Sequence, residues 1–332
     1  MQERLEAAKA ITFKQCAESY IKTHRVSWRN AKHAAQWEAT LATYAEPIIG
    51  ALPVQVVDTA LVMKVLEQEV CDAPDKPTAP LWTVRPETAS RLRGRMESIL
   101  DWAKVRGHRE GENPARWRGH LDKLLPARAK VRKVEHHAAL PYTELPDFMT
   151  ALRTHGGIAA RALEFAILTA ARTGETIAAT WDEINIGKKV WMPPGRMKAG
   201  REHRVPLAAR ALAILQEMKP APGAETKFIF AGGRAGKPLS NMALLMLLRR
   251  MGRGDLTAHG FRSSFRDWAA ERTSFPSEVV EMALAHAVGS KVEAAYRRGD
   301  LFDKRRRLMD AWAEFLATAP NERSKVVSRR GA

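Results

Sequence analysis

The chain has 332 residues, of which 45% are hydrophobic and 27% are charged, as in an ordinary globular protein with room for two domains. Its formal net charge of +17 favours a polyanionic partner, most commonly nucleic acid, although a basic surface without such a partner is the alternative. Two distant cysteines exclude a disulfide framework and a CxxC zinc site. No apolar run or signal sequence indicates a membrane, so we expect a cytoplasmic protein with no membrane partner.

The segment 10–125 is expected to be a helical domain. Pro47, Gly50 and Pro53 predict a break after its second helix, and the Pro- and Asp-rich segment 72–80 predicts a loop after the third. Apolar residues recur at helical spacing in four stretches: 13–21, 28–41, 59–70 and 87–105.

A basic linker is expected at 126–138, because this stretch has many positive charges and few apolar side chains. A linker of this kind suits a phosphate backbone, and a solvated tether is an equally good interpretation. The candidate DNA contacts are Arg128, Lys130, Arg132 and Lys133.

A second domain is expected at 139–320, mostly α with a small β-sheet, which gives the chain an α+β class. Strands are predicted at 189–192 and 203–207 with a turn between them, and a further extended piece at 228–230. The basic segment 321–332 is expected to be a flexible tail. Helices are predicted at 145–154, 158–171, 208–218, 241–251, 260–271, 276–285, 290–296 and 302–317.

Arg172 ends the nearly all-apolar stretch 163–171, where an arginine is costly to desolvate without a partner. It is a candidate phosphate ligand because a guanidinium matches two phosphate oxygens and stays charged. A structural ion pair with Glu175 is the competing interpretation.

His259 and Arg262 are three residues apart and would share one face of a helix, offering a proton carrier beside a guanidinium. Lys198 lies in the predicted hairpin turn, from which a lysine could protonate a leaving oxygen. Arg196 and Arg201 in the same turn are further candidate DNA contacts. Each of these signals is common by chance when taken alone.

His286 precedes Tyr296 by ten residues (296 − 286 = 10), and Tyr296 alone among the four tyrosines is followed by two arginines. Positive neighbours favour the phenolate and so favour nucleophilic attack by a tyrosine. A core tyrosine in a helix is the alternative for Tyr296 considered alone.

In this order the motifs resemble the tyrosine recombinases, specifically phage and genomic-island integrases. The resemblance covers about 10–317. It rests on Leu-Thr-Ala-Ala-Arg172-Thr-Gly-Glu175, Arg-Met-Lys198 before Arg204-Val-Pro-Leu, Thr-Ala-His259-Gly-Phe-Arg262, Leu-Ala-His286 and Lys291-Val-Glu-Ala-Ala-Tyr296, with His136-His137-Ala-Ala-Leu and the Arg305-Arg-Arg-Leu-Met-Asp-Ala-Trp segment as further matches.

The resemblance implies a helical, SAM-like core-binding domain followed by a tyrosine-recombinase catalytic domain. It implies that Tyr296 attacks DNA to form a 3′-phosphotyrosyl link, without metal, ATP or another cofactor. The implied supporting roles belong to Arg172, Lys198, His259, Arg262 and His286, with Glu175 orienting the basic groups.

The implied partners are double-stranded attachment-site DNA, three further copies in a homotetramer, and excisionase or DNA-bending accessory proteins. The chain begins near the core-binding domain, so an N-terminal arm-binding domain is expected to be absent. The alternatives are a type IB topoisomerase-like activity, a non-catalytic DNA-binding regulator, and a helical metal enzyme using His136 and His137, for which carboxylate or thiolate partners are missing at ligand spacing.

Overall fold

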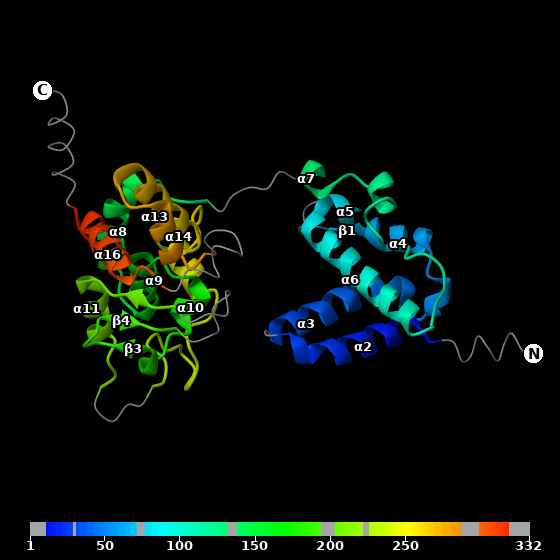
Figure 1. Cartoon of the computed structure of the whole chain (residues 1–332), viewed down its shortest axis with the longest axis horizontal. Coiled ribbons are helices and arrows are strands. Elements are labelled where there is room, and N and C mark those ends of the chain that lie inside the picture. The colour runs from blue at the N-terminus through cyan, green and yellow to red at the C-terminus, as the bar shows by residue number, and fades with distance from the viewer. Residues whose placement is uncertain are drawn as a thin grey trace, which may run out of the picture. The chain divides into compact units, whose positions relative to one another are not determined.

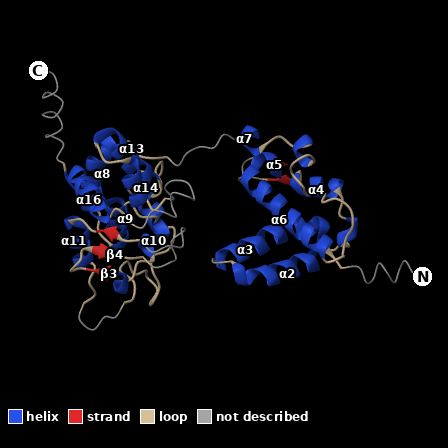
Figure 2. Ribbon diagram, viewed as in Figure 1, coloured by secondary structure: helices blue, strands red, loops and turns tan. Residues whose placement is uncertain are grey.

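The computed structural model describes residues 11–28, 31–71, 77–131, 138–193, 203–221, 226–286 and 299–318. The chain divides into two compact units, Met1–Glu135 and His136–Ala332 (Figure 1). Each unit has its own hydrophobic core. Helices dominate both units and the strands are short (Figure 2), so the predicted α+β class is confirmed. None of the helices described has the length and apolar character needed to span a bilayer.

Unit 1 is built around the 20-residue helix α6, which packs against the first helix, α2. Helix α2 begins with a capping box in which Thr12 and Gln15 satisfy each other's backbone N–H groups. The elements of unit 1 are α2 (Phe13–His24), η1 (Arg25–Ser27), α3 (Ala31–Thr40), η2 (Leu41–Gly50), η3 (Val54–Val56), α4 (Thr59–Leu66), β1 (Glu69–Val70), β2 (Ala79–Pro80), α5 (Leu81–Val84), α6 (Pro86–Val105), η4 (Leu121–Lys123) and α7 (Arg128–Val131).

The predicted break at 45–53 is wrong in its position, because η2 continues through Pro47 to Gly50 as a π-helix. Pro47 has no backbone N–H to donate in either kind of helix, and in an α-helix its ring would also clash with the carbonyl four residues earlier; the π-helix pairs residues five apart and departs from that α-helical geometry. The third predicted helix is too long at its end. Glu69 and Val70 instead pair with Pro80 and Ala79 as antiparallel strands.

Unit 2 carries the second core and the other elements of the described residues. They are η5 (Tyr142–Glu144), α8 (Leu145–Thr154), α9 (Ile158–Thr169), α10 (Thr173–Ile177), η6 (Trp181–Glu183), β3 (Ile184–Asn185), β4 (Val190–Trp191), β5 (Val205–Pro206), α11 (Ala209–Glu217), α12 (Ala243–Arg250), α13 (Gly260–Arg272), α14 (Ser277–Ala283) and α16 (Phe302–Ala317).

The small sheet of unit 2 has the order β3-β4-β5 and is antiparallel throughout. The two strands predicted around 189–192 and 203–207 are confirmed as β4 and β5. Strand β3 was not predicted; its two residues are recognised as a strand by their pairing with Trp191 and Val190 of β4. The predicted helix 290–296 and the tail 321–332 lie outside the described residues.

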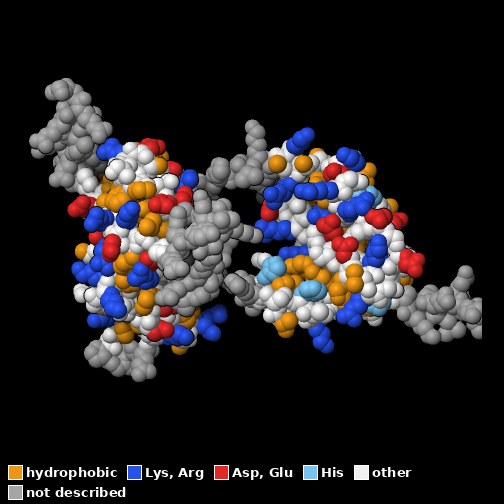
Figure 3. Space-filling view, in the orientation of Figure 1, with side chains coloured by type: hydrophobic (Ala, Val, Ile, Leu, Met, Phe, Trp, Pro, Cys, Tyr) orange, Lys and Arg blue, Asp and Glu red, His pale blue; other side chains and the backbone are white. Residues whose placement is uncertain are grey.

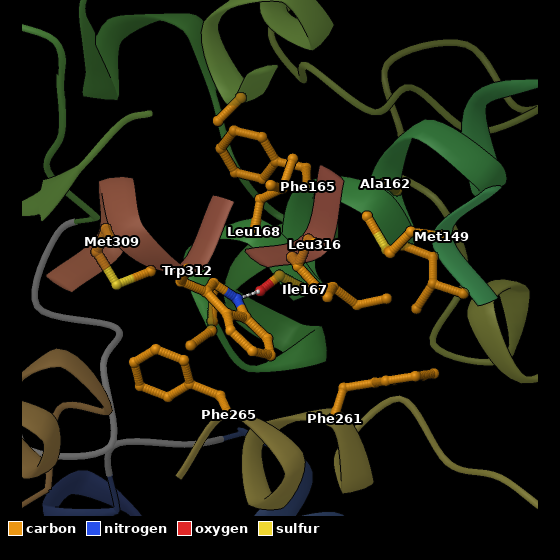
Figure 4. Packing of buried hydrophobic residues seen from close by; sticks show 14 of the residues in the cluster. Met149, Ala162, Phe165, Ile167, Leu168, Phe261, Phe265, Met309, Trp312 and Leu316 are labelled. Atoms are coloured by element: carbon orange, nitrogen blue, oxygen red, sulfur yellow. Dashed lines mark hydrogen bonds between the residues drawn. The ribbon is translucent and has the colours of Figure 1, made fainter. Parts of the chain in front are cut away.

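Helix α9 is the centre of the unit 2 core and is buried along most of its length. Trp312 of α16 packs on it and donates its indole N–H to the Ile167 carbonyl over 2.9 Å (Figure 4). That carbonyl lies in the last turn of α9, where intrahelical partners run out. The bond therefore fixes the end of α9, from which the candidate site begins.

Candidate active site

The first guanidinium of the candidate site belongs to Arg172, three residues beyond the end of α9. Its Nη1 donates to Glu175 Oε1 over 2.8 Å, and the other Glu175 oxygen accepts the Arg172 backbone N–H over 3.0 Å. Glu175 thereby caps the N-terminus of α10 and at the same time orients the Arg172 guanidinium. Arg172 Nη2 also reaches the Ala285 carbonyl at 3.4 Å, which brings the end of α14 to the site.

The second guanidinium belongs to Arg262 in the first turn of α13, and Arg262 is only 5% exposed. It donates through Nη1 to the Ala170 carbonyl and through Nη2 to the Leu284 carbonyl over 2.6 Å. A buried arginine needs such partners to offset its lost hydration. Arg262 therefore ties the turn after α9 to the end of α14.

Two residues in left-handed backbone conformations flank these arginines. Ala170 has φ of 49° and Ala285 has φ of 51°, values that cost a non-glycine residue energy. Each supplies a carbonyl to an arginine, Ala170 to Arg262 and Ala285 to Arg172. The strain is therefore located at the turns that aim these carbonyls into the site.

His286 connects Arg262 to a carboxylate. Its Nε2 lies 3.2 Å from Arg262 Nη2, and its Nδ1 lies 2.6 Å from Glu281 Oε2. Because the guanidinium only donates, Nε2 must be an acceptor here, and Nδ1 carries the proton given to Glu281. Glu281 is itself held by Arg266, whose Nε lies 2.7 Å from Oε1.

The clustering of charge shifts the acidity of these groups. Burial, reinforced by the nearby Arg172 charge, lowers the pKa of Arg262 to about 10, so it remains protonated at neutral pH. Burial raises the pKa of Glu281, but hydrogen bonds from Arg266 and His286 outweigh it and hold that pKa below its ordinary value. The site therefore keeps two guanidinium charges and a carboxylate behind the imidazole.

His203 is a site residue that the sequence reasoning missed. Burial, and then the charge of Arg305, lowers the pKa of His203 to about 4, although Glu175 and Asp300 oppose the shift. The available signal was a histidine at the start of the predicted strand 203–207, which follows the predicted turn that holds Lys198. A small cavity places His203 beside Arg262; its lining also includes Glu175, Trp191, Pro193 and Ala285.

The structure brings together four of the predicted site residues: Arg172, Glu175, Arg262 and His286. His259 is exposed and immediately precedes α13, so it lies one helical turn from Arg262. Lys198 and Tyr296 lie outside the described residues.

Of the predicted DNA contacts, two lie among the described residues and four lie outside them. Arg128 and Lys130 are exposed on α7, and Arg128 forms an ion pair with Glu87 of α6. On the face shown in Figure 3, Lys and Arg side chains lie among Asp and Glu on both units. The remaining predicted basic contacts and the alternative metal ligands lie outside the described residues: Arg132, Lys133, Arg196, Arg201, His136 and His137.

Two family models match the chain. The phage integrase central domain matches residues 13–120, and the phage integrase family matches residues 139–301. The prophage integrase IntZ of Escherichia coli K12 is 30% identical over 310 residues, covering 92% of this chain and 71% of IntZ. The prophage integrase IntA of the same strain is 38% identical over 181 residues, which is 53% of this chain and 43% of IntA.

Solved structures share the fold. A lambda integrase tetramer bound to a Holliday junction superposes with a TM-score of 0.62 at 16% identity, covering 88% of this chain and 79% of that one. The Tn1549 transposon integrase in complex with circular intermediate DNA gives 0.59 at 14% identity, covering 90% and 99%. With both units matched and IntZ similar along most of its length, the chain belongs to the phage integrase family of tyrosine recombinases.

Proposed function

We propose that this chain is the site-specific recombinase that integrates or excises a prophage or genomic island. The main support for the proposal is that Arg172 and Arg262 are held close together by hydrogen bonds to carbonyls in the turns after α9 and α14. Two fixed guanidinium groups of this kind suit a phosphoryl transition state, whose charge lies on the non-bridging oxygens.

In the proposed reaction Tyr296 attacks the scissile phosphorus. The Tyr296 Oη–P bond forms and the P–O5′ bond breaks, which leaves a 3′-phosphotyrosyl link and a free 5′ hydroxyl. The link conserves the phosphoester, so the 5′ hydroxyl of another strand can reverse the step without ATP. Arg172 and Arg262 bind the non-bridging oxygens throughout.

Proton transfer completes the step. His259 takes the proton of the Tyr296 hydroxyl, and Lys198 gives a proton to the departing 5′ oxygen. His286 accepts from Arg262 through Nε2. If Nε2 gains a proton, it becomes a donor to a phosphate oxygen, and Glu281 stabilises the resulting imidazolium from the other side.

We further propose that four copies act on two attachment sites, with excisionase or DNA-bending proteins as accessory partners, in the cytoplasm. Support comes from the fold shared with an integrase described as a tetramer on a Holliday junction. The candidate DNA contacts are Arg128, Lys130, Arg132, Lys133, Arg196 and Arg201.

A recombination assay separates this function from its rivals. Duplexes that bind the protein are selected from a random-sequence library, and two plasmids carrying the selected site are incubated with it in EDTA. We expect recombinant junctions between the plasmids. Relaxation of supercoils without junctions would favour the topoisomerase-like activity, and specific binding with neither product would favour a non-catalytic regulator.

A further inference from the structure

A second cluster of charges lies in unit 2, centred on Asp300. Arg204 donates two hydrogen bonds to this carboxylate, from Nε to Oδ2 over 2.9 Å and from Nη2 to Oδ1 over 2.6 Å. Arg305 donates from Nη2 to Oδ2 over 2.7 Å. Paired guanidinium–carboxylate bonds of this geometry fix orientation as well as distance.

Arg305 also holds the backbone on both sides of the cluster. Its Nε donates to the Asp300 carbonyl over 2.7 Å and its Nη1 to the Arg204 carbonyl over 2.6 Å, and the residue is only 1% exposed. The ring of Phe302 lies against the Arg204 guanidinium at 4.3 Å. Leu301, which lies between Asp300 and Phe302 in the sequence, has φ of 52°, so the backbone here is held in a conformation that costs a non-glycine residue energy.

The cluster joins two segments that each follow a predicted catalytic residue. Arg204 precedes β5 and is six residues after Lys198, while Asp300 is four residues after Tyr296. Four residues of chain reach at most about 14 Å, so the anchor at Asp300 limits where the Tyr296 hydroxyl can go. His203, next to Arg204, and Val205 of β5 line the cavity beside Arg262, so the segment that binds Asp300 also borders Arg262.

Resting on the proposed function, we infer that the Arg204–Asp300–Arg305 cluster positions the nucleophile. It holds Asp300, four residues after Tyr296, against the segment that leads into β5 and borders Arg262. Asp300, Arg204 and Arg305 are positioning residues in this role, and none of them is required to touch DNA.

The charge state of the cluster suits a permanent anchor. Burial raises the pKa of Asp300, but Arg204 and Arg305 more than offset this and hold it below the ordinary aspartate value. The Asp300 carboxylate is therefore ionised at neutral pH, and its ion pairs with Arg204 and Arg305 persist when the pH changes around neutrality.

Unit 2 offers a matched structural control. Glu164 is 0% exposed and accepts bonds from Arg153, Arg161 and Arg210 over 2.7 to 2.9 Å. This ion cluster joins α8, α9 and α11, and it includes none of the predicted catalytic residues. A second control is Asp255, an exposed carboxylate that binds Arg253 with two bonds of 3.1 and 3.0 Å.

The test measures single-turnover formation of the covalent adduct on nicked duplexes carrying the selected site. We expect Asp300→Asn to slow adduct formation about 10- to 100-fold, the scale of a small misplacement of reacting groups, with the Kd for DNA nearly unchanged. Arg204→Gln, which replaces a side chain that is 45% exposed, should also slow adduct formation. Glu164→Gln and Asp255→Asn should keep wild-type rates, even if Glu164→Gln lowers the melting temperature as much as Asp300→Asn does.

A substrate with sulfur in place of the bridging 5′ oxygen identifies which group the cluster positions, because a thiolate leaves without the proton from Lys198. Asp300→Asn should remain slow on it. Restoration to the wild-type rate would assign the cluster to Lys198 and overturn the inference. Equal rates of adduct formation for Asp300→Asn and wild type on the ordinary nicked duplex would also overturn the inference. The same holds if Glu164→Gln slows adduct formation as much as Asp300→Asn does. An absence of adduct with wild type would instead overturn the proposed function, and the inference with it.

Discussion

Arg262 has two tasks in this chain, and they can be measured separately. It bonds three groups from two different turns, the carbonyls of Ala170 and Leu284 and the ring of His286. It is also proposed to stabilise the charge of the reacting phosphate. A substitution at this position therefore affects both folding and catalysis.

We expect Arg262→Ala to reduce adduct formation by about 10²–10³-fold, the usual cost of removing one transition-state donor. It also leaves buried carbonyls without donors, so unit 2 should lose stability by roughly 1–3 kcal/mol per carbonyl. Adduct kinetics below the lowered melting temperature, with Kd from titration of labelled DNA, separate the two effects. A loss of DNA affinity that matched the loss of rate would contradict the catalytic role.

His203 predicts a pH dependence of stability. With its folded pKa near 4 and an unfolded value near 6.5, the unfolded chain binds a proton between these values and the folded chain does not. Stability of unit 2 should therefore fall as pH drops from about 6.5 to about 4, by up to about 1.4 kcal/mol per pH unit.

Urea unfolding of unit 2 at pH 7.5 and pH 5 tests this dependence. His203→Gln should shrink the difference between the two pH values, whereas His155→Gln, at the C-terminal end of α8, should leave it unchanged. An undiminished difference in His203→Gln would show that other groups cause the acid sensitivity.

At the scale of elements, the N-terminus of α13 is held by a close backbone crossing. A Cβ added at Gly260 would lie 2.2 Å from the Ala138 carbonyl oxygen, a distance that no side chain tolerates. Ser264 of the same helix donates its hydroxyl to the Leu140 carbonyl. The start of unit 2 therefore fixes the helix that carries His259 and Arg262.

We expect Gly260→Ala to destabilise unit 2 by about 1–3 kcal/mol through overpacking, and to slow adduct formation because α13 must shift. The same substitution at Gly94, inside α6 with nothing within 4 Å of the added Cβ, should stabilise unit 1 by about 0.5–1 kcal/mol. Thermal unfolding of the two variants measures this contrast. Wild-type stability in Gly260→Ala would mean that the backbone at Ala138 can move away from the added Cβ at little energetic cost.

Features set by local spacing could be predicted from the sequence. Helix α6 and the β4–β5 pair follow from patterns that each segment carries by itself. The strand at Val70 depends on a partner at Ala79, and the π-helix through Pro47 depends on packing, so neither shows in the local pattern. The Arg172–Glu175 pair was foreseen from spacing, whereas the Asp300 cluster joins residues 96 positions apart and needed the fold.

At the scale of the whole molecule, the net charge of +17 predicts how DNA binding depends on salt. If six to ten phosphates are contacted, affinity should fall about 10³–10⁵-fold between 50 and 200 mM salt. Lys130→Ala should reduce the slope of log K against log salt by about 1. Arg128→Ala should reduce it less, because Glu87 already neutralises that charge. A slope near zero would contradict phosphate contacts altogether.

Covalent attack of Tyr296 on DNA can be observed by trapping the protein–DNA link that it forms. Wild type and Tyr296→Phe are incubated in EDTA with nicked duplexes of the selected site, and denaturing gels are examined for a protein–DNA adduct. We expect an adduct with wild type and none with Tyr296→Phe, while both proteins bind the duplex equally. An adduct that survives in Tyr296→Phe would contradict this expectation, since another residue would then be the nucleophile.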